Sequence, residues 1–175
     1  MRNKIKIIPL IICVSLLILG CVSPVMEHLE QGGAYADNEQ WDEAIIEYSK
    51  AIELDPEFAP SYYCRGLAYH GKGDLDQAIA DFDKAINLDP DYAWAYLNRG
   101  LDYDEKGDLD QAIADFDKAI NIDSEFALAY LCRGLAYAIE GEVTKAVSDF
   151  EKVIELSDDP AIVERAQQLL DELRQ

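Results

Sequence analysis

Histidine is scarce in this chain, and the motifs of common enzyme classes are missing. Only His28 and His70 occur among 175 residues, and they lie in different parts of the sequence. There is no zinc-ligand spacing, phosphate-binding loop or G-x-S-x-G motif. Carboxylates are numerous, but they are spread along the whole chain, so no acid–base pair stands out. The sequence therefore predicts no catalytic residue, no metal ligand and no cofactor.

Basic residues are also few. Lys and Arg number 15 against 35 Asp and Glu, which gives a formal net charge of −20. Nucleic acid is excluded as a partner, because its backbone is held by Lys and Arg contacts. Anionic lipid would be repelled by the same surface. The acidity suits a basic partner, although a solvated, soluble surface explains it equally simply.

A long hydrophobic run is missing too. The first apolar stretch, residues 7–19, is interrupted by Pro9, Cys13 and Ser15. It is shorter than a typical transmembrane helix, which needs roughly 20 residues. Three basic residues precede it. A basic head followed by a short apolar core is typical of a secretory signal, here residues 1–20.

The signal ends in a sequence that resembles the lipobox of bacterial lipoproteins: Ile18, Leu19, Gly20 and Cys21. The resemblance implies cleavage after Gly20 and attachment of lipid, including fatty acyl chains such as palmitate, to Cys21. Residues 21–24 would then form a short lipidated tether. The alternative is an uncleaved N-terminal anchor with an incidental cysteine. Both interpretations place the rest of the chain outside the cytoplasm.

One stretch is written twice. The sequence KGDLDQAIADFDKAIN occupies residues 72–87 and again residues 106–121, an offset of 34 residues. This is the length of the tetratricopeptide repeat, a helix–turn–helix unit. Four such units fit without a gap: 25–58, 59–92, 93–126 and 127–160. Four family positions recur in each unit. The small residue is Gly32, Gly66, Gly100 and Gly134, and the first aromatic residue is Tyr35, Tyr69, Tyr103 and Tyr137. The alanine is Ala44, Ala78, Ala112 and Ala146, and the second aromatic residue is Tyr48, Phe82, Phe116 and Phe150.

The chain thus resembles the tetratricopeptide repeat family over almost all of its mature length. The resemblance implies an all-α solenoid, in which stacked helical hairpins bury a continuous core. Residues 161–175 carry apolar side chains at helical spacing, so we expect a ninth helix that caps the last repeat. The first unit, residues 25–58, matches the family least well, as is usual for a terminal repeat.

Cys64 and Cys132 share the sixth position of their units, two units apart. Packed helices lie about 8–10 Å apart, so these positions should be on the order of 20 Å distant. A disulfide requires Cα atoms within about 7 Å. We therefore predict that no disulfide joins them, although an even pair of cysteines in an exported protein would suggest one.

An arginine at position 7 and an aspartate at position 23 occur together in units 2, 3 and 4, whereas the first unit has Gln31 and Glu47 there. Their co-occurrence predicts ion pairs between the two helices of a unit; a basic stripe for ligands is the alternative. The predicted structural pairs are Arg65 with Asp81, Arg99 with Asp115, and Arg133 with Asp149.

Asp102 is unusual, because it stands at position 10, where the other units have Ala34, Ala68 and Ala136. A carboxylate at a packed position needs a partner. We expect Arg99 or Arg133 to supply it; a strained functional carboxylate is the alternative.

Partners of tetratricopeptide proteins commonly bind the concave groove formed by the first helix of each unit. Some members hold a terminal carboxylate there with lysines, which this chain lacks. The resemblance implies a mainly apolar groove suited to a peptide or a helix. The alternative is that these residues pack on one another or on the capping helix. The groove positions are Tyr63, Cys64, Leu67, His70, Trp94, Leu97, Asn98, Leu101, Asp104, Glu105, Leu128, Leu131, Cys132 and Leu135.

These observations favour a membrane-anchored, extracytoplasmic scaffold that binds a protein or peptide partner. Val22 follows Cys21, and in a Gram-negative cell the absence of aspartate there favours the periplasmic side of the outer membrane. A structural homo-oligomer of the cell envelope is the alternative, and a non-catalytic subunit of an envelope enzyme is a further one. An active site would require His70 to share a pocket with Asp104 or Glu105.

Overall fold

Within residues 23–174, which a computed structural model describes, the chain forms nine helices and no strand. The predicted signal, Gly20 and Cys21 lie outside the described residues. The all-α solenoid inferred from the repeats is confirmed. Its helices are α1 (Pro24–Asp37), α2 (Trp41–Leu54), α3 (Ala59–Lys72), α4 (Leu75–Leu88), α5 (Ala93–Lys106), α6 (Leu109–Ile122), α7 (Ala127–Glu140), α8 (Val143–Leu156) and α9 (Pro160–Leu173).

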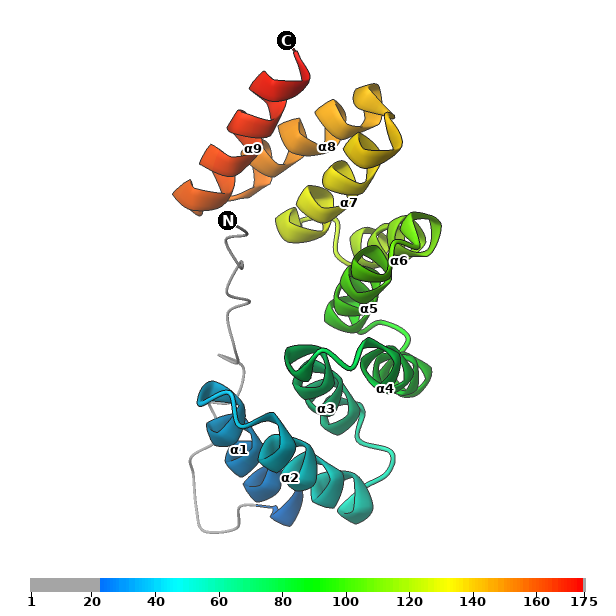
Figure 1. Cartoon of the computed structure of the whole chain (residues 1–175), viewed down its shortest axis with the longest axis vertical. Coiled ribbons are helices and arrows are strands. Elements are labelled where there is room, and N and C mark those ends of the chain that lie inside the picture. Colours follow the sequence, from blue (N-terminus) through cyan, green and yellow to red (C-terminus); the bar gives the residue numbers. More distant parts are fainter. Residues whose placement is uncertain (1–22, 175) are drawn as a thin grey trace.

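The helices stack into a curved array that runs from α1 and α2 at one end to α9 at the other (Figure 1). Each odd helix pairs with the even helix that follows it, and α1, α3, α5 and α7 also contact one another in succession. Helices α4 and α6 lie on the outer side of the curve (Figure 1). The odd helices therefore form an inner layer and the even helices an outer one.

Each hairpin closes because a glycine on the odd helix faces an aromatic ring on the even helix. A Cβ atom added to Gly100 would lie 2.6 Å from Cε1 of Phe116, which is closer than carbon atoms can approach. Phe116 itself is 1% exposed. The same contact joins Gly66 to Phe82. Glycine is needed at this position because any side chain would displace the central ring of the hairpin.

The turn inside the second, third and fourth hairpins depends on a left-handed glycine. Gly73, Gly107 and Gly141 have φ angles of 87°, 83° and 80°, which favour a residue without Cβ. Asp108 then caps α6 by accepting a hydrogen bond from the backbone nitrogen of Gln111 at 3.4 Å. In the second and third hairpins this glycine belongs to the duplicated stretch, and Gly141 supplies it in the fourth.

Helix α9 covers the end of the array. Its buried side chains Ala166, Leu169 and Leu170 pack in one cluster with Leu131 of α7 and Phe150 of α8. The last repeat would otherwise leave this apolar face in water. Within residues 23–174, no helix has both the length and the apolar character that a membrane span requires.

Candidate partner-binding surface

The three predicted arginine–aspartate pairs hold the hairpins together and leave no arginine stripe for a ligand. Each guanidinium binds its aspartate through two nitrogens: Arg65 with Asp81 at 2.7 and 2.8 Å, Arg99 with Asp115 at 2.8 and 2.6 Å, and Arg133 with Asp149 at 2.8 and 2.7 Å. The aspartates are 4–6% exposed. Such two-point contacts are strong and geometrically specific.

The remaining nitrogen of each guanidinium reaches back to the preceding unit. Arg65 Nη1 donates to Ser49 Oγ at 3.1 Å, and Arg99 Nη1 binds Asp83 of α4. Arg133 binds Asp117 of α6 in the same way. In units 2, 3 and 4, one arginine per unit therefore joins three helices. These contacts, here called the arginine ladder, fix the stacking of consecutive units.

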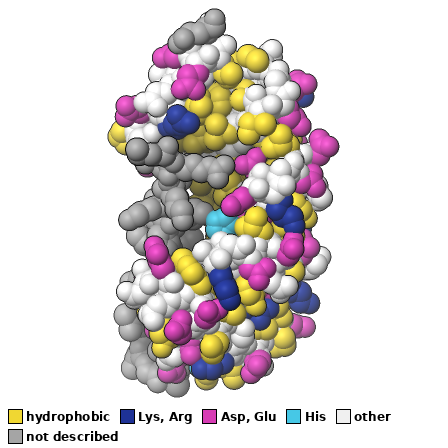
Figure 2. Space-filling model, viewed as in Figure 1, with side chains coloured by type: hydrophobic (Ala, Val, Ile, Leu, Met, Phe, Trp, Pro, Cys, Tyr) yellow, Lys and Arg dark blue, Asp and Glu magenta, His cyan; other side chains and the backbone are white. Residues whose placement is uncertain are grey.

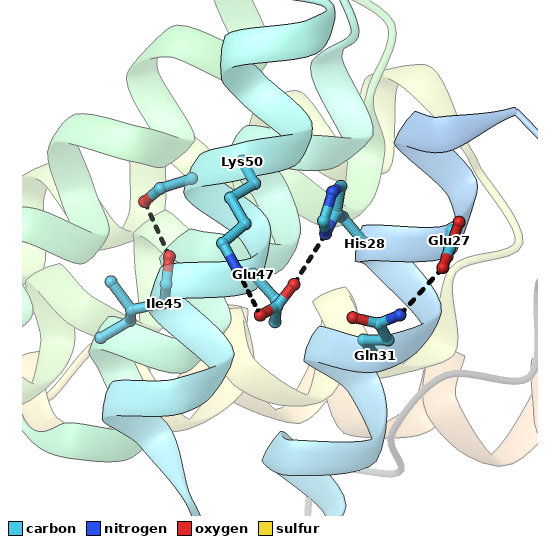
Figure 3. Close-up of polar contacts among 7 residues, drawn as sticks. Glu27, His28, Gln31, Ile45, Glu47 and Lys50 are labelled. Atoms are coloured by element: carbon cyan, nitrogen blue, oxygen red, sulfur yellow. Dashed lines mark hydrogen bonds and ion pairs between the residues drawn. The ribbon is translucent and has the colours of Figure 1, made fainter.

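The first unit has a different pair, which the sequence pattern did not reveal. His28 of α1 shares a hydrogen bond of 2.7 Å with Glu47 of α2, and Lys50 donates to the other oxygen of Glu47 at 2.7 Å (Figure 3). Lys50 and then His28 lower the pKa of Glu47. Gln31, at the arginine position, instead bonds Glu27 on its own helix at 3.2 Å. His28 stands about one helical turn before the arginine position. It thus pairs with Glu47 as the arginine of each other unit pairs with its aspartate.

No disulfide links Cys64 and Cys132 in the described part of the chain. Burial raises the pKa of the Cys132 thiol to about 12, with the nearby Asp104 adding to the effect. A thiol with such a pKa is protonated at neutral pH, so Cys132 is a poor nucleophile.

Four of the predicted groove residues do not offer a surface to a partner. Cys64, Leu97, Asn98 and Leu131 are only 9%, 1%, 5% and 5% exposed. Leu97 packs in the third hairpin, and Leu131 packs against α8 and α9. The groove assignment is corrected for these four, because neighbouring helices cover the side of each helix on which they lie.

The other ten predicted groove residues are at least partly exposed: Tyr63, Leu67, His70, Trp94, Leu101, Asp104, Glu105, Leu128, Cys132 and Leu135. Trp94 is the most exposed of the large apolar ones, at 40%, and its ring meets Phe126 edge-on at 4.7 Å. Buried Asn98 donates to the Tyr63 hydroxyl at 3.1 Å and to the Trp94 carbonyl at 2.8 Å. Asn98 therefore holds the Tyr63 side chain and the backbone at Trp94 from within the array.

Asp102 is bound by a histidine rather than an arginine. Its Oδ1 lies 2.5 Å from Nδ1 of His70, so the pair joins α3 to α5 across two units. The prediction of Arg99 or Arg133 as partner is wrong, because both guanidinium groups are held by aspartates of the even helices. The Asp102 side chain is fully buried, and its Oδ2 has no hydrogen-bond partner among residues 23–174.

The His70–Asp102 pair binds protons more readily than either free group. The hydrogen bond to Asp102 raises the pKa of His70, and burial raises the pKa of Asp102. An active site would require Asp104 or Glu105 to share a pocket with His70. Neither of them makes a hydrogen bond to His70 in the described part of the chain. Among the described residues, no group of three or more His, Cys, Asp and Glu side chains is placed to hold a metal ion.

Two family models match the chain. One, described as "TPR repeat", matches residues 32–73, 71–103 and 100–141, and another, "Tetratricopeptide repeat", matches residues 127–160. No curated protein is significantly similar in sequence.

Solved structures have the same fold. A crystal structure of MamA is 37% identical with a TM-score of 0.71, and the match covers 75% of this chain and 77% of that one. The Arabidopsis OM64 TPR domain is 28% identical with a TM-score of 0.62, covering 64% and 93%. The first TPR of Spaghetti (RPAP3), bound to an HSP90 peptide, is 24% identical with a TM-score of 0.61, covering 67% and 94%; it shows a shared fold.

Proposed function

Because the chain belongs to the tetratricopeptide repeat family, we propose that it is a non-catalytic scaffold that binds a peptide or helix of a partner protein. The binding surface is the inner face of α3, α5 and α7. The observation that carries the proposal is the exposed indole of Trp94, which packs against the ring of Phe126. Ordered, exposed aromatic rings are the usual anchors of protein interfaces.

The composition of the inner face supports a protein partner. Partly exposed apolar side chains lie on the same three inner helices, α3, α5 and α7, namely Tyr63, Leu101, Leu128 and Leu135. Apolar side chains on such a face suit a segment that brings its own apolar anchors. A structural homo-oligomer, in which a second copy fills this face, is the other candidate; a non-catalytic subunit of an envelope enzyme is a variant of the scaffold role.

The proposal extends to the location of the protein. Cleavage after Gly20 and acylation of Cys21 would tether the array close to a membrane surface and outside the cytoplasm. The basic head, the short apolar run and the lipobox-like Ile18–Cys21 sequence support this. Two or more acyl chains anchor a protein stably, whereas one binds only marginally. A Cys21→Ala protein should therefore be released from membranes, and retention after signal processing would refute the lipid anchor.

The partner-binding proposal is tested in two steps. Crosslinking and pull-down from the native envelope identify a partner, and the affinity of that partner is then measured for wild type and variants. Trp94→Ala should weaken binding by about 1–4 kcal/mol. The matched control is Ile46→Ala on α2, another exposed apolar residue (54%), which should leave affinity unchanged. Equal affinities of wild type and Trp94→Ala would refute the assigned face.

A further inference from the structure

The two junctions between inner helices are not equivalent in charge. Where α3 meets α5, His70 at position 12 faces Asp102 of the next unit and binds it. Where α5 meets α7, position 12 is Asp104, which interacts with the thiol of Cys132 on α7, while position 10 of α7 is Ala136. The junction between α5 and α7 therefore holds the carboxylate of Asp104, and no basic side chain among the described residues pairs with it.

The side chain of Asp104 makes no hydrogen bond and no ion pair in the described part of the chain. Its side chain is partly buried, and burial followed by repulsion from Glu105 raises its pKa. Both residues also lie in the last turn of α5, where the helix dipole disfavours negative charge. A partly desolvated carboxylate with no cation nearby destabilises the free protein and would be relieved by a positively charged ligand.

Carboxylates of α5 also lie at the junction between α3 and α5. Glu105 is exposed and acts electrostatically on both His70 and Asp102. Asp102, although fully buried, keeps one oxygen without any hydrogen-bond donor. The neighbouring cation, Lys106, is engaged by Asp76 of α4. Two acidic side chains of α5, Asp102 and Glu105, thus act on a single histidine, and one oxygen of Asp102 is left without a donor among the described residues.

Apolar surface lies directly beside these charges. Trp94, Leu101 and Glu105 are seven and four positions apart, so they follow one face of α5. At the height of α3 and α5, a histidine, a carboxylate and hydrophobic side chains adjoin on the surface (Figure 2). A ligand that fits would present apolar groups toward Trp94 and Leu101 and a cation toward Asp104 and Glu105.

We propose that the segment bound by the inner face is a basic amphipathic helix, whose Lys or Arg side chains pair with Asp104 and Glu105 while its apolar side chains pack on Trp94 and Leu101. This inference rests on the proposed function and specifies the partner's chemistry. Charge complementarity carries it: a chain of net charge −20 repels an acidic segment and a second copy of itself.

The test uses three synthetic peptides of about 18 residues, long enough to form a helix on binding. The first has leucines spaced three and four apart, flanked by lysines. In the second the lysines are replaced by glutamates, and in the third the leucines are replaced by serines. Binding of labelled peptide to residues 22–175 is followed by fluorescence anisotropy. The lysine–leucine peptide should bind, and each altered peptide should bind at least about tenfold more weakly.

The protein variants separate this site from general attraction to an acidic protein. Asp104→Asn with Glu105→Gln should weaken the lysine–leucine peptide about tenfold and reduce its salt dependence. The control, Glu43→Gln with Asp110→Asn, removes the same charge from exposed positions on α2 and α6 and should leave affinity unchanged. Circular dichroism and thermal melts establish that both variants are folded.

Specific outcomes would overturn the inference. Equal binding of lysine and glutamate peptides, if both still require Trp94, would reject a basic partner while keeping the proposed binding face. Equal weakening by the two double variants would reject Asp104 and Glu105 as the site. Failure of all three peptides, together with self-association in light scattering that Trp94→Ala abolishes, would assign the face to a second copy.

Discussion

Both histidines of the chain bind a carboxylate, but the two pairs are built differently. The His28–Glu47 pair lies within the first hairpin, and Lys50 donates a second hydrogen bond to Glu47 (Figure 3). The His70–Asp102 pair joins two hairpins; Asp102 is fully buried, and His70 is its one hydrogen-bond partner in the described chain. The side chain of Glu47 is 11% exposed.

This difference shows what decides the protonation of a carboxylate in a helical array. Glu47, with two hydrogen-bond partners and some solvent, has a lowered pKa. Asp102 has one partner and no solvent, and burial raises its pKa. The first pair replaces an arginine ladder contact, whereas the second introduces charge at a position that is alanine in every other unit. The second pair is therefore the more fragile one.

The largest expected effect is the loss of His70. His70→Ala leaves Asp102 buried without a partner and should lower the free energy of unfolding by about 2–3 kcal/mol. His28→Ala is the matched control, and it should lose less than about 1 kcal/mol because Lys50 and water still stabilise Glu47. Urea denaturation at neutral pH measures both. Equal losses would show that the two pairs are energetically alike.

The repeat register explains why some of this was predictable. The arginine–aspartate pairs recur at fixed positions in three units, so their co-occurrence in the sequence pointed to contact. His70 and Asp102 each occur once, in different units, and no second example reveals that positions 12 and 10 of successive units meet. The replacement of alanine by Asp102 was the available signal, and it indicated a buried carboxylate without identifying its partner.

The sequence indicated which residues share the inner face of each odd helix, but not how far each of these residues is exposed to solvent. Position 5 of unit 3 and of unit 4, Leu97 and Leu131, is buried because the stacked neighbours and α9 cover it. Trp94 stays exposed because it stands at the start of α5, where Phe126 covers only one edge of the ring. Burial of this kind depends on the curvature of the whole array, which the local pattern does not contain.

The second prediction concerns rescue by alanine. Adding Asp102→Ala to His70→Ala restores the residue type of the other units and removes the unpaired carboxylate, so about 1–2 kcal/mol of the lost stability should return. In the first hairpin, adding Glu47→Ala to His28→Ala should give no recovery, because Lys50 loses its partner. The four-variant cycles are compared by urea denaturation. A further loss in the His70→Ala, Asp102→Ala protein would mean that Asp102 stabilises the fold without His70.

The third prediction is that the pairs respond to pH in opposite directions. The pKa of His70 is raised, so its stabilisation is present below the ordinary histidine value of 6.5 and is lost as pH rises through the higher folded value. The pKa of Asp102 is also raised, so its contribution is lost as pH rises from the ordinary aspartate value of 3.8. The pKa of Glu47 is lowered, so its stabilisation is present above 4.5 and is lost as pH falls. Glu105 and Lys106 act on the His70–Asp102 pair from α5 and stay unchanged in the experiment.

The measurement is the stability difference between wild type and each double variant across pH. For His70→Ala with Asp102→Ala, the advantage of wild type should be larger at about pH 5.5 than at about pH 8.5, two values on either side of the ordinary histidine pKa. For His28→Ala with Glu47→Ala, the advantage of wild type should shrink below about pH 4.5. Parallel pH profiles for the two variants would contradict the assigned difference in protonation.

The smallest expected effect comes from making the first hairpin resemble the others. Gln31→Arg places a guanidinium sixteen residues before Glu47, the separation that joins Arg65 to Asp81. Glu47 is already bound by His28 and Lys50. A third cation should therefore add only about 0–1 kcal/mol to the free energy of unfolding. Gln31→Met controls for the change in packing and side-chain length. If Gln31→Arg stabilised the protein by as much as His70→Ala destabilises it, the existing His28–Glu47–Lys50 contacts could not be a full substitute for the arginine ladder.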